Sequence, residues 1–87
     1  MRRRVVVHGK VQGVFFRDSL RRLADRRGVS GWARNKPEGT VEAVFEGEPD
    51  DVERLVSFAK AGPPDARVEG VDVLDEEPEG LSGFAIR

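Results

Sequence analysis

The order of two hydrophobic periodicities is the feature of this chain that most limits its possible folds. Two segments repeat apolar residues at the spacing of an amphipathic α-helix: Phe16 to Arg27 and Asp50 to Ala61. Four other segments are β-branched or alternating, as in strands: Arg3 to His8, Ser30 to Asn35, Thr40 to Glu46 and Ala66 to Asp75. The predicted order is therefore strand, helix, strand, strand, helix, strand.

Signals at the ends of these segments agree with this assignment. Gly28 stands where a helix ends in the left-handed conformation, and Asp50 with Glu53 has the spacing of a capping box. The run from Lys36 to Gly39 suits a β-turn, because proline and glycine occupy positions that such turns favour. The second and third strands are therefore expected to form a hairpin, and the alternation in Thr40 to Glu46 predicts one buried and one mostly wet face.

This order predicts an α+β fold, the ferredoxin-like βαββαβ sandwich, in which two helices pack on one face of an antiparallel sheet. The tail from Leu81 to Arg87 follows a turn-rich stretch and is expected to add a short edge strand, which gives four or five strands in all. A chain of 87 residues has material for one core. Residues 1–87 are therefore expected to form a single domain.

Composition excludes several kinds of chemistry. The chain has no cysteine and one histidine, His8, so it offers no disulfide, no thiol nucleophile, no cysteine-ligated zinc and no pair of histidines. No apolar run approaches the roughly 18 residues of a membrane span. The basic start is followed by only three valines, too few for a signal peptide. A cytoplasmic location is expected, and His8 receives no functional role.

Charge is sorted along the chain. Residues 1–36 hold eleven Lys or Arg against two Asp, whereas residues 37–87 hold four Lys or Arg against fourteen Asp or Glu. Two interpretations remain open. The basic half would attract an anionic partner, or the two halves neutralise each other within the fold.

The segment from Gly9 to Arg17 is the first candidate site. It leaves a strand, passes two glycines and enters a helix, so its backbone N–H groups can converge on an anion such as phosphate. Arg17 lies in the first helical turn, where its guanidinium can pair with two phosphate oxygens. No Walker A or dinucleotide fingerprint is present. Simple turn geometry with a solvated Arg17 is the alternative.

Asn35 is the second candidate. It ends a strand just before the hairpin turn, where an asparagine commonly serves the turn itself. However, it is the only asparagine in the chain, beside a single glutamine, Gln12. Its side chain has both a donor and an acceptor, which suits it to hold a water molecule for attack.

Two motifs resemble those of a known family. The segment Val11 to Arg17 (VQGVFFR) and the segment Gly28 to Glu42 (GVSGWARNKPEGTVE) resemble the paired signatures of the acylphosphatases. The resemblance extends over essentially the whole chain. Glu38 stands where the family usually has Asp, and Ala33 where Val is common, but neither departure touches a candidate catalytic side chain.

The resemblance implies hydrolysis of the carboxyl–phosphate bond of small acylphosphates without a metal or cofactor. By carry-over, Arg17 and the loop amides around Gln12, Gly13, Val14 and Phe15 bind the phosphoryl group, and Asn35 orients the attacking water. The missing acid and base fit this chemistry, because phosphoryl transfer depends chiefly on positioning and charge stabilisation. Trp32 is expected to pack beneath or beside the site.

Two other functions compete with this interpretation. Related folds bind single-stranded RNA on the open sheet face, and the basic half would suit this, although the aromatic RNA-binding pattern is absent. A non-catalytic phosphate-binding module is the other alternative. The expected partner is a small acylphosphate, with no nucleic acid and no membrane, and the expected state is a monomer.

Overall fold

Seven elements occur in the computed structural model, which describes all 87 residues. They are β1 (Arg2–Lys10), α1 (Phe16–Arg27), β2 (Ser30–Asn35), β3 (Val41–Glu46), α2 (Pro49–Ala61), β4 (Arg67–Glu76) and β5 (Phe84–Ile86). The two helices and four long strands confirm the predicted order. The short fifth strand lies within the tail where an edge strand was expected.

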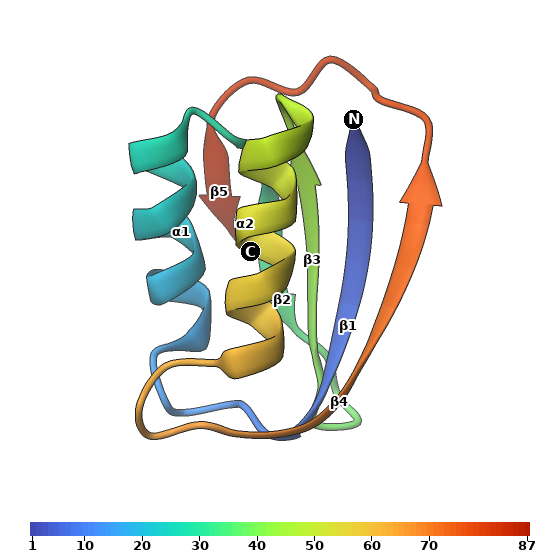
Figure 1. Cartoon of the computed structure of the whole chain (residues 1–87). Helices are drawn as coiled ribbons and strands as arrows, with labels where there is room; N and C mark the ends of the chain where they lie inside the picture. The colour runs from blue at the N-terminus through green and yellow to red at the C-terminus, as the bar shows by residue number, and fades with distance from the viewer.

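The sheet has five strands in the order β4-β1-β3-β2-β5. The first four strands pair antiparallel, as predicted. The fifth does not, because β5 pairs parallel to β2, with Gly31 opposite Phe84 and Ala33 opposite Ile86. Figure 1 shows the reason: the chain leaves β4, crosses the end of the sheet where β2 begins, and then runs along β2 in the same direction. The sheet is therefore mixed at this edge.

Both helices cover one face of the sheet, as Figure 1 shows, and the core lies between these two layers. Sixteen buried residues form the core, and each of the elements β1, α1, β2, β3 and α2 contributes to it. The helical faces are those that the periodicity predicts, for example Phe16, Leu20 and Ala24 on α1. Phe84 of β5 stacks on Phe45 of β3 with ring centroids 6.1 Å apart, which fastens the last strand to the core. Neither helix has the length and apolar character needed to cross a membrane.

The ends of the helices bear out one sequence signal and contradict another. Gly28 ends α1 in the left-handed conformation, as predicted. The predicted capping box is wrong: α2 begins one residue earlier than expected, with Glu48 as N-cap, Pro49 next, and no side-chain cap. Proline fixes its own φ at a helical value, so it is well suited to the first helical position.

The outer face of the sheet, opposite the helices, carries Trp32. Its neighbour Ala33 belongs to the core, and the alternation of a strand turns Trp32 to the other side. There Arg4, Arg34 and Arg87 lie over the indole, with guanidinium carbons 5.5, 5.7 and 4.5 Å from the ring centroid. Trp32 is only 8% exposed as a result. Its predicted place beneath or beside the site is wrong, because the small Ala33 occupies the core side of β2.

Candidate active site

The loop between β1 and α1, residues 11–15, forms the floor of the site and is called the cradle loop below. Val11 and Val14 are buried in the core and anchor it. Gly13 has φ of 73° and Phe15 has φ of 62°, so the backbone twice enters the left-handed region. These reversals fold the loop back to the start of α1.

The start of α1 is left uncapped. Phe15 is its N-cap residue, and no side chain bonds to the first turn. The backbone N–H groups of residues 12–18 donate no hydrogen bond within the chain. Such free donors, together with the positive end of the helix dipole, favour an anion at this place.

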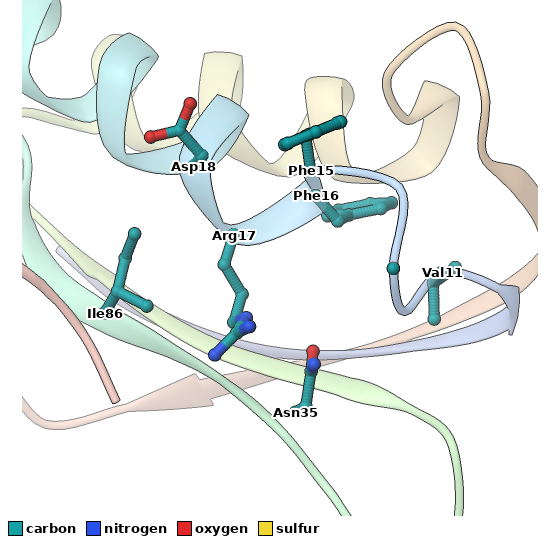
Figure 2. Close-up of a pocket in the computed structure, with 8 residues that line it drawn as sticks. Val11, Phe15, Phe16, Arg17, Asp18, Asn35 and Ile86 are labelled. Carbon is teal, nitrogen blue, oxygen red and sulfur yellow. The ribbon is translucent and has the colours of Figure 1, made fainter.

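Arg17 adds a full positive charge to these donors. It lies in the first turn of α1, and Figure 2 shows its side chain directed toward Asn35. One guanidinium nitrogen, Nη1, donates a hydrogen bond to the backbone oxygen of Arg87 over 3.0 Å. The neighbouring Asp18 pairs with Arg21 and Arg22, at 2.8 and 2.9 Å. The acid beside Arg17 is therefore engaged elsewhere, and Arg17 keeps its charge available for an anion.

Asn35 ends β2 on the opposite side of the same cavity (Figure 2). The turn that follows it is closed by backbone bonds from Lys36 to Thr40 and from Gly39 to Lys36. The side chain of Gln12 donates two further bonds there, to the backbone oxygens of Lys36 at 2.8 Å and Thr40 at 2.9 Å. None of these bonds uses the side chain of Asn35. Gln12 thus ties the cradle loop to the hairpin turn and fixes the distance between the two halves of the site.

A cavity of about 270 Å³ lies between these segments. The residues that line it come from the cradle loop, α1, β2 and β5: Val11, Gly13, Phe15, Phe16, Arg17, Asp18, Asn35 and Ile86. The predicted residues Gly13, Phe15, Arg17 and Asn35 are therefore brought together. The other two predicted residues, Gln12 and Val14, turn their side chains to the hairpin turn and to the core, which leaves only their backbone for the site.

Sequence reasoning missed Ile86 and the backbone oxygen of Arg87. Both reach the site because β5 pairs with β2. No local pattern in the sequence of the tail predicts this pairing. His8, for which the sequence predicts no role, lies on β1 and does not line the cavity. Its side chain pairs with Asp72 of the neighbouring strand β4 at 2.9 Å. No group of three or more His, Asp or Glu side chains in the chain is arranged to hold a metal ion.

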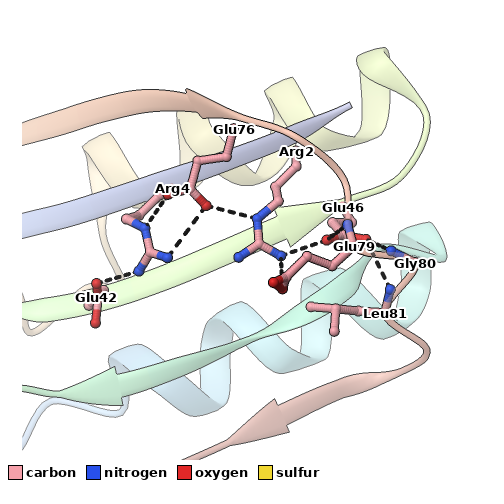
Figure 3. A network of polar contacts seen from close by, with 8 residues as sticks. All are labelled: Arg2, Arg4, Glu42, Glu46, Glu76, Glu79, Gly80 and Leu81. Atoms are coloured by element: carbon pink, nitrogen blue, oxygen red, sulfur yellow. Dashed lines mark hydrogen bonds and ion pairs between the residues drawn. The ribbon is translucent and has the colours of Figure 1, made fainter.

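An ionic network on the outer face holds the segment that leads to β5. Residues 77–83, called the crossover below, pass the end of the sheet where Glu46 lies. The Glu46 carboxylate accepts hydrogen bonds from the backbone N–H groups of Glu79, Gly80 and Leu81, at 2.9, 3.1 and 3.0 Å (Figure 3). Arg2, itself 5% exposed, donates to Glu46 at 2.6 Å. This network places β5, and with it Ile86, beside Arg17.

The network also answers the question raised by the sorted charges. Arg2 and Arg4 of β1 pair with acids of β3 and β4, among them Glu42, Glu46 and Glu76 (Figure 3). The two halves of the chain therefore neutralise each other across the sheet. β3 is consequently buried on both faces, so the prediction of a wet face is wrong: Glu42 and Glu46 are covered by their arginine partners.

The cavity, the free amides and Arg17 define a small α+β domain suited to hold an anion at the start of a helix. Comparison with known proteins identifies the family to which this domain belongs. A family model for acylphosphatases matches residues 3–86. The chain belongs to the acylphosphatase family.

Individual relatives agree with this assignment. An acylphosphatase of Rubrobacter xylanophilus is 62% identical over 86 residues, which are 97% of this chain and 77% of that protein. An acylphosphatase of Thermococcus kodakarensis is 58% identical over 80 residues, with 92% and 88% of the two chains covered. The solved structure of an acylphosphatase from Coxiella burnetii superposes with a TM-score of 0.94 at 41% identity, covering 99% of this chain and 90% of that one.

The pKa of Glu46 generates a prediction for stability. Burial works against the carboxylate, but the hydrogen bonds from the crossover amides and Arg2 outweigh it and lower the pKa to about 2. Because the folded pKa lies below the ordinary value of 4.5, this stabilisation is complete above pH 4.5 and is lost as the pH falls toward 2. Glu46→Gln should lower the free energy of unfolding at pH 7 by on the order of 2 kcal/mol.

Urea unfolding of the wild type and Glu46→Gln at several pH values between 7 and 2.5 measures this effect. The difference between the two proteins should shrink as the pH falls below about 4.5. Burial raises the pKa of Glu42, but hydrogen bonds from Arg34 and Arg4 outweigh it and lower the pKa. Hydrogen bonds from Arg4 and Arg2 lower the pKa of Glu76. Both carboxylates are present in both proteins, and Glu76 is linked to Glu46 through Arg2. A difference that stays constant over the whole range would show that the charge of Glu46 does not stabilise the fold.

Proposed function

We propose that this chain hydrolyses the carboxyl–phosphate bond of small acylphosphates in the cavity between α1 and β2, without a metal or a cofactor. The observation that carries the proposal is the placement of Arg17, at an uncapped helix start, facing Asn35 in one cavity (Figure 2). The products are a carboxylate and inorganic phosphate.

The cradle loop and Arg17 bind the phosphoryl group. The free N–H groups of Gln12, Gly13, Val14 and Phe15 point their partial positive charge at its oxygens, and Arg17 supplies the full charge. In phosphoryl transfer the negative charge is spread over the three equatorial oxygens as the bond to the leaving group breaks. Donors that are already fixed in place stabilise this charge without the cost of reorienting solvent.

Asn35 orients the water that attacks phosphorus. Its amide oxygen accepts a hydrogen bond from the water, which leaves a lone pair of the water oxygen directed at phosphorus. A new bond forms between this oxygen and phosphorus while the bond between phosphorus and the acyl oxygen breaks. The electron pair of that bond leaves with the carboxylate, and a water proton passes to a phosphate oxygen or to solvent.

The site needs no strong general acid for this reaction. The leaving group is a carboxylate, which is stable as an anion at neutral pH because its conjugate acid has a pKa near 4. The side chains that line the cavity include one acid, Asp18, and it is engaged by Arg21 and Arg22. Positioning and charge stabilisation by Arg17, Asn35 and the amides are sufficient.

Two observations weigh against the competing functions. A module that only binds phosphate would need the cradle loop and Arg17 but not Asn35, whose side chain takes no part in closing its own turn. An RNA-binding module of this fold stacks bases on exposed aromatic rings of the sheet. Here the outer face carries Trp32 at 8% exposure beneath three arginines. The hydrolytic function is therefore the one that the geometry favours.

We also propose that residues 1–87 act as one domain and as a monomer in the cytoplasm. One core of 16 residues supports the single domain, and a cavity completed by one chain supports the monomer. Light scattering at assay concentration should give a mass near 9.6 kDa. Twice that value would contradict the monomer.

The roles of Arg17 and Asn35 can be separated by hydrolysis of benzoyl phosphate, followed by absorbance in the presence of a chelator. Arg17→Ala should lower kcat/KM by about 10² to 10³, because it removes both binding and charge stabilisation. Asn35→Ala should lower kcat by about 10², because the water loses its orientation. The chelator should leave the wild-type rate unchanged.

Binding of inorganic phosphate by calorimetry gives the second readout. Arg17→Ala should lose most of the affinity, whereas Asn35→Ala should keep it, since Asn35 acts on water. Arg26→Ala is the matched control, because Arg26 lies in the last turn of the same helix and makes no ion pair. Full activity of either site variant, or equal damage in the control, would contradict the assigned roles.

A further inference from the structure

Two exposed apolar side chains line the same cavity as Arg17. Four large hydrophobic residues are exposed in this chain: Met1 at 41%, Phe15 at 76%, Leu74 at 51% and Ile86 at 39%. Phe15 and Ile86 both line the cavity, and in Figure 2 they flank Arg17. Binding of the phosphoryl group by the backbone amides and Arg17 uses neither of these two side chains.

The conformation of Phe15 is unfavourable in two respects. It is the one residue other than glycine with a positive φ, at 62°, and the left-handed region is strained for a bulky side chain. Its ring is also the most exposed of the four hydrophobic side chains. A glycine at this position would give the same backbone without the strain. The ring takes part in neither the turn nor the core, which leaves it free to contact a ligand in the cavity.

Ile86 belongs to β5 near the C-terminus, far from Phe15 in the sequence. It is paired with Ala33 of β2, and Phe84 two residues earlier is stacked on Phe45. Its position is therefore fixed by the sheet. An apolar side chain of β5 and an apolar ring of the cradle loop therefore line one cavity together with Arg17 (Figure 2).

We propose that Phe15 and Ile86 bind the acyl group of the substrate, and that they select acylphosphates with an apolar, preferably flat acyl group. The inference rests on the proposed function, because the phosphoryl group must sit at Arg17 for its acyl substituent to reach these side chains. A flat apolar group can stack on the Phe15 ring and contact Ile86, and each contact removes apolar surface from water. A methyl group, as in acetyl phosphate, can cover little of either side chain.

The test compares benzoyl phosphate with acetyl phosphate. The wild type should prefer benzoyl phosphate in kcat/KM, and Phe15→Ala and Ile86→Ala should each reduce this preference, by roughly tenfold for Phe15→Ala. The reduction should appear mainly in KM for benzoyl phosphate. Phe15→Gly separates ring from backbone: it relieves the strain at φ 62° yet should lose the preference as Phe15→Ala does. Phe15→Leu should restore part of it.

Leu74→Ala is the matched control, because Leu74 is a similarly exposed apolar residue on β4, outside the cavity. The inhibition constant of inorganic phosphate, which has no acyl group, should change by a smaller factor than the preference does. An equal change in both, or an unchanged preference in the Phe15 and Ile86 variants, would overturn the inference and leave the hydrolytic function standing. A wild type that hydrolyses neither compound would overturn the proposed function and this inference with it.

Discussion

The free amide N–H groups at the start of α1 are the constraint around which the site is arranged. A helix normally satisfies its first donors with a capping side chain, and leaving them without a partner costs stability. Here the N-cap residue is Phe15, which cannot cap, and the cradle loop adds further free donors. The anion-binding capacity of the backbone is thus retained for a ligand, and Arg17 in the first turn of the helix adds the charge that amides lack.

The partners of this helix start come from distant parts of the chain, and two polar tethers hold them in place. Gln12 binds the hairpin turn that follows Asn35, through the backbone oxygens of Lys36 and Thr40. Glu46, at the other end of the sheet, binds the crossover that leads to β5. Strand pairing and the core fix β2 and β5, and these tethers hold the hairpin turn and the crossover next to Asn35 and β5. Stability and function therefore depend on the same part-buried polar contacts.

Periodicity and turn chemistry were sufficient to predict the helices, the four long strands and the hairpin. They could not predict the direction of β5, because a three-residue strand carries little pattern and its place follows from how Glu46 holds the crossover. They also misplaced Trp32, since alternation in β2 identifies two faces without saying which one the helices cover. Arg17 and Asn35 were predictable because each stands at a strand or helix end that this topology brings together. Ile86 was not, because its place depends on pairing at long range.

The central claim is that water held by Asn35 attacks phosphorus in the cradle formed by Arg17 and the loop amides. Hydrolysis of benzoyl phosphate in water enriched in the oxygen-18 isotope tests this claim most directly, because the label marks the atom that is attacked. Mass spectrometry of the products should find the label in inorganic phosphate and none in benzoate. Label in benzoate would place the attack at the carbonyl carbon and contradict the account.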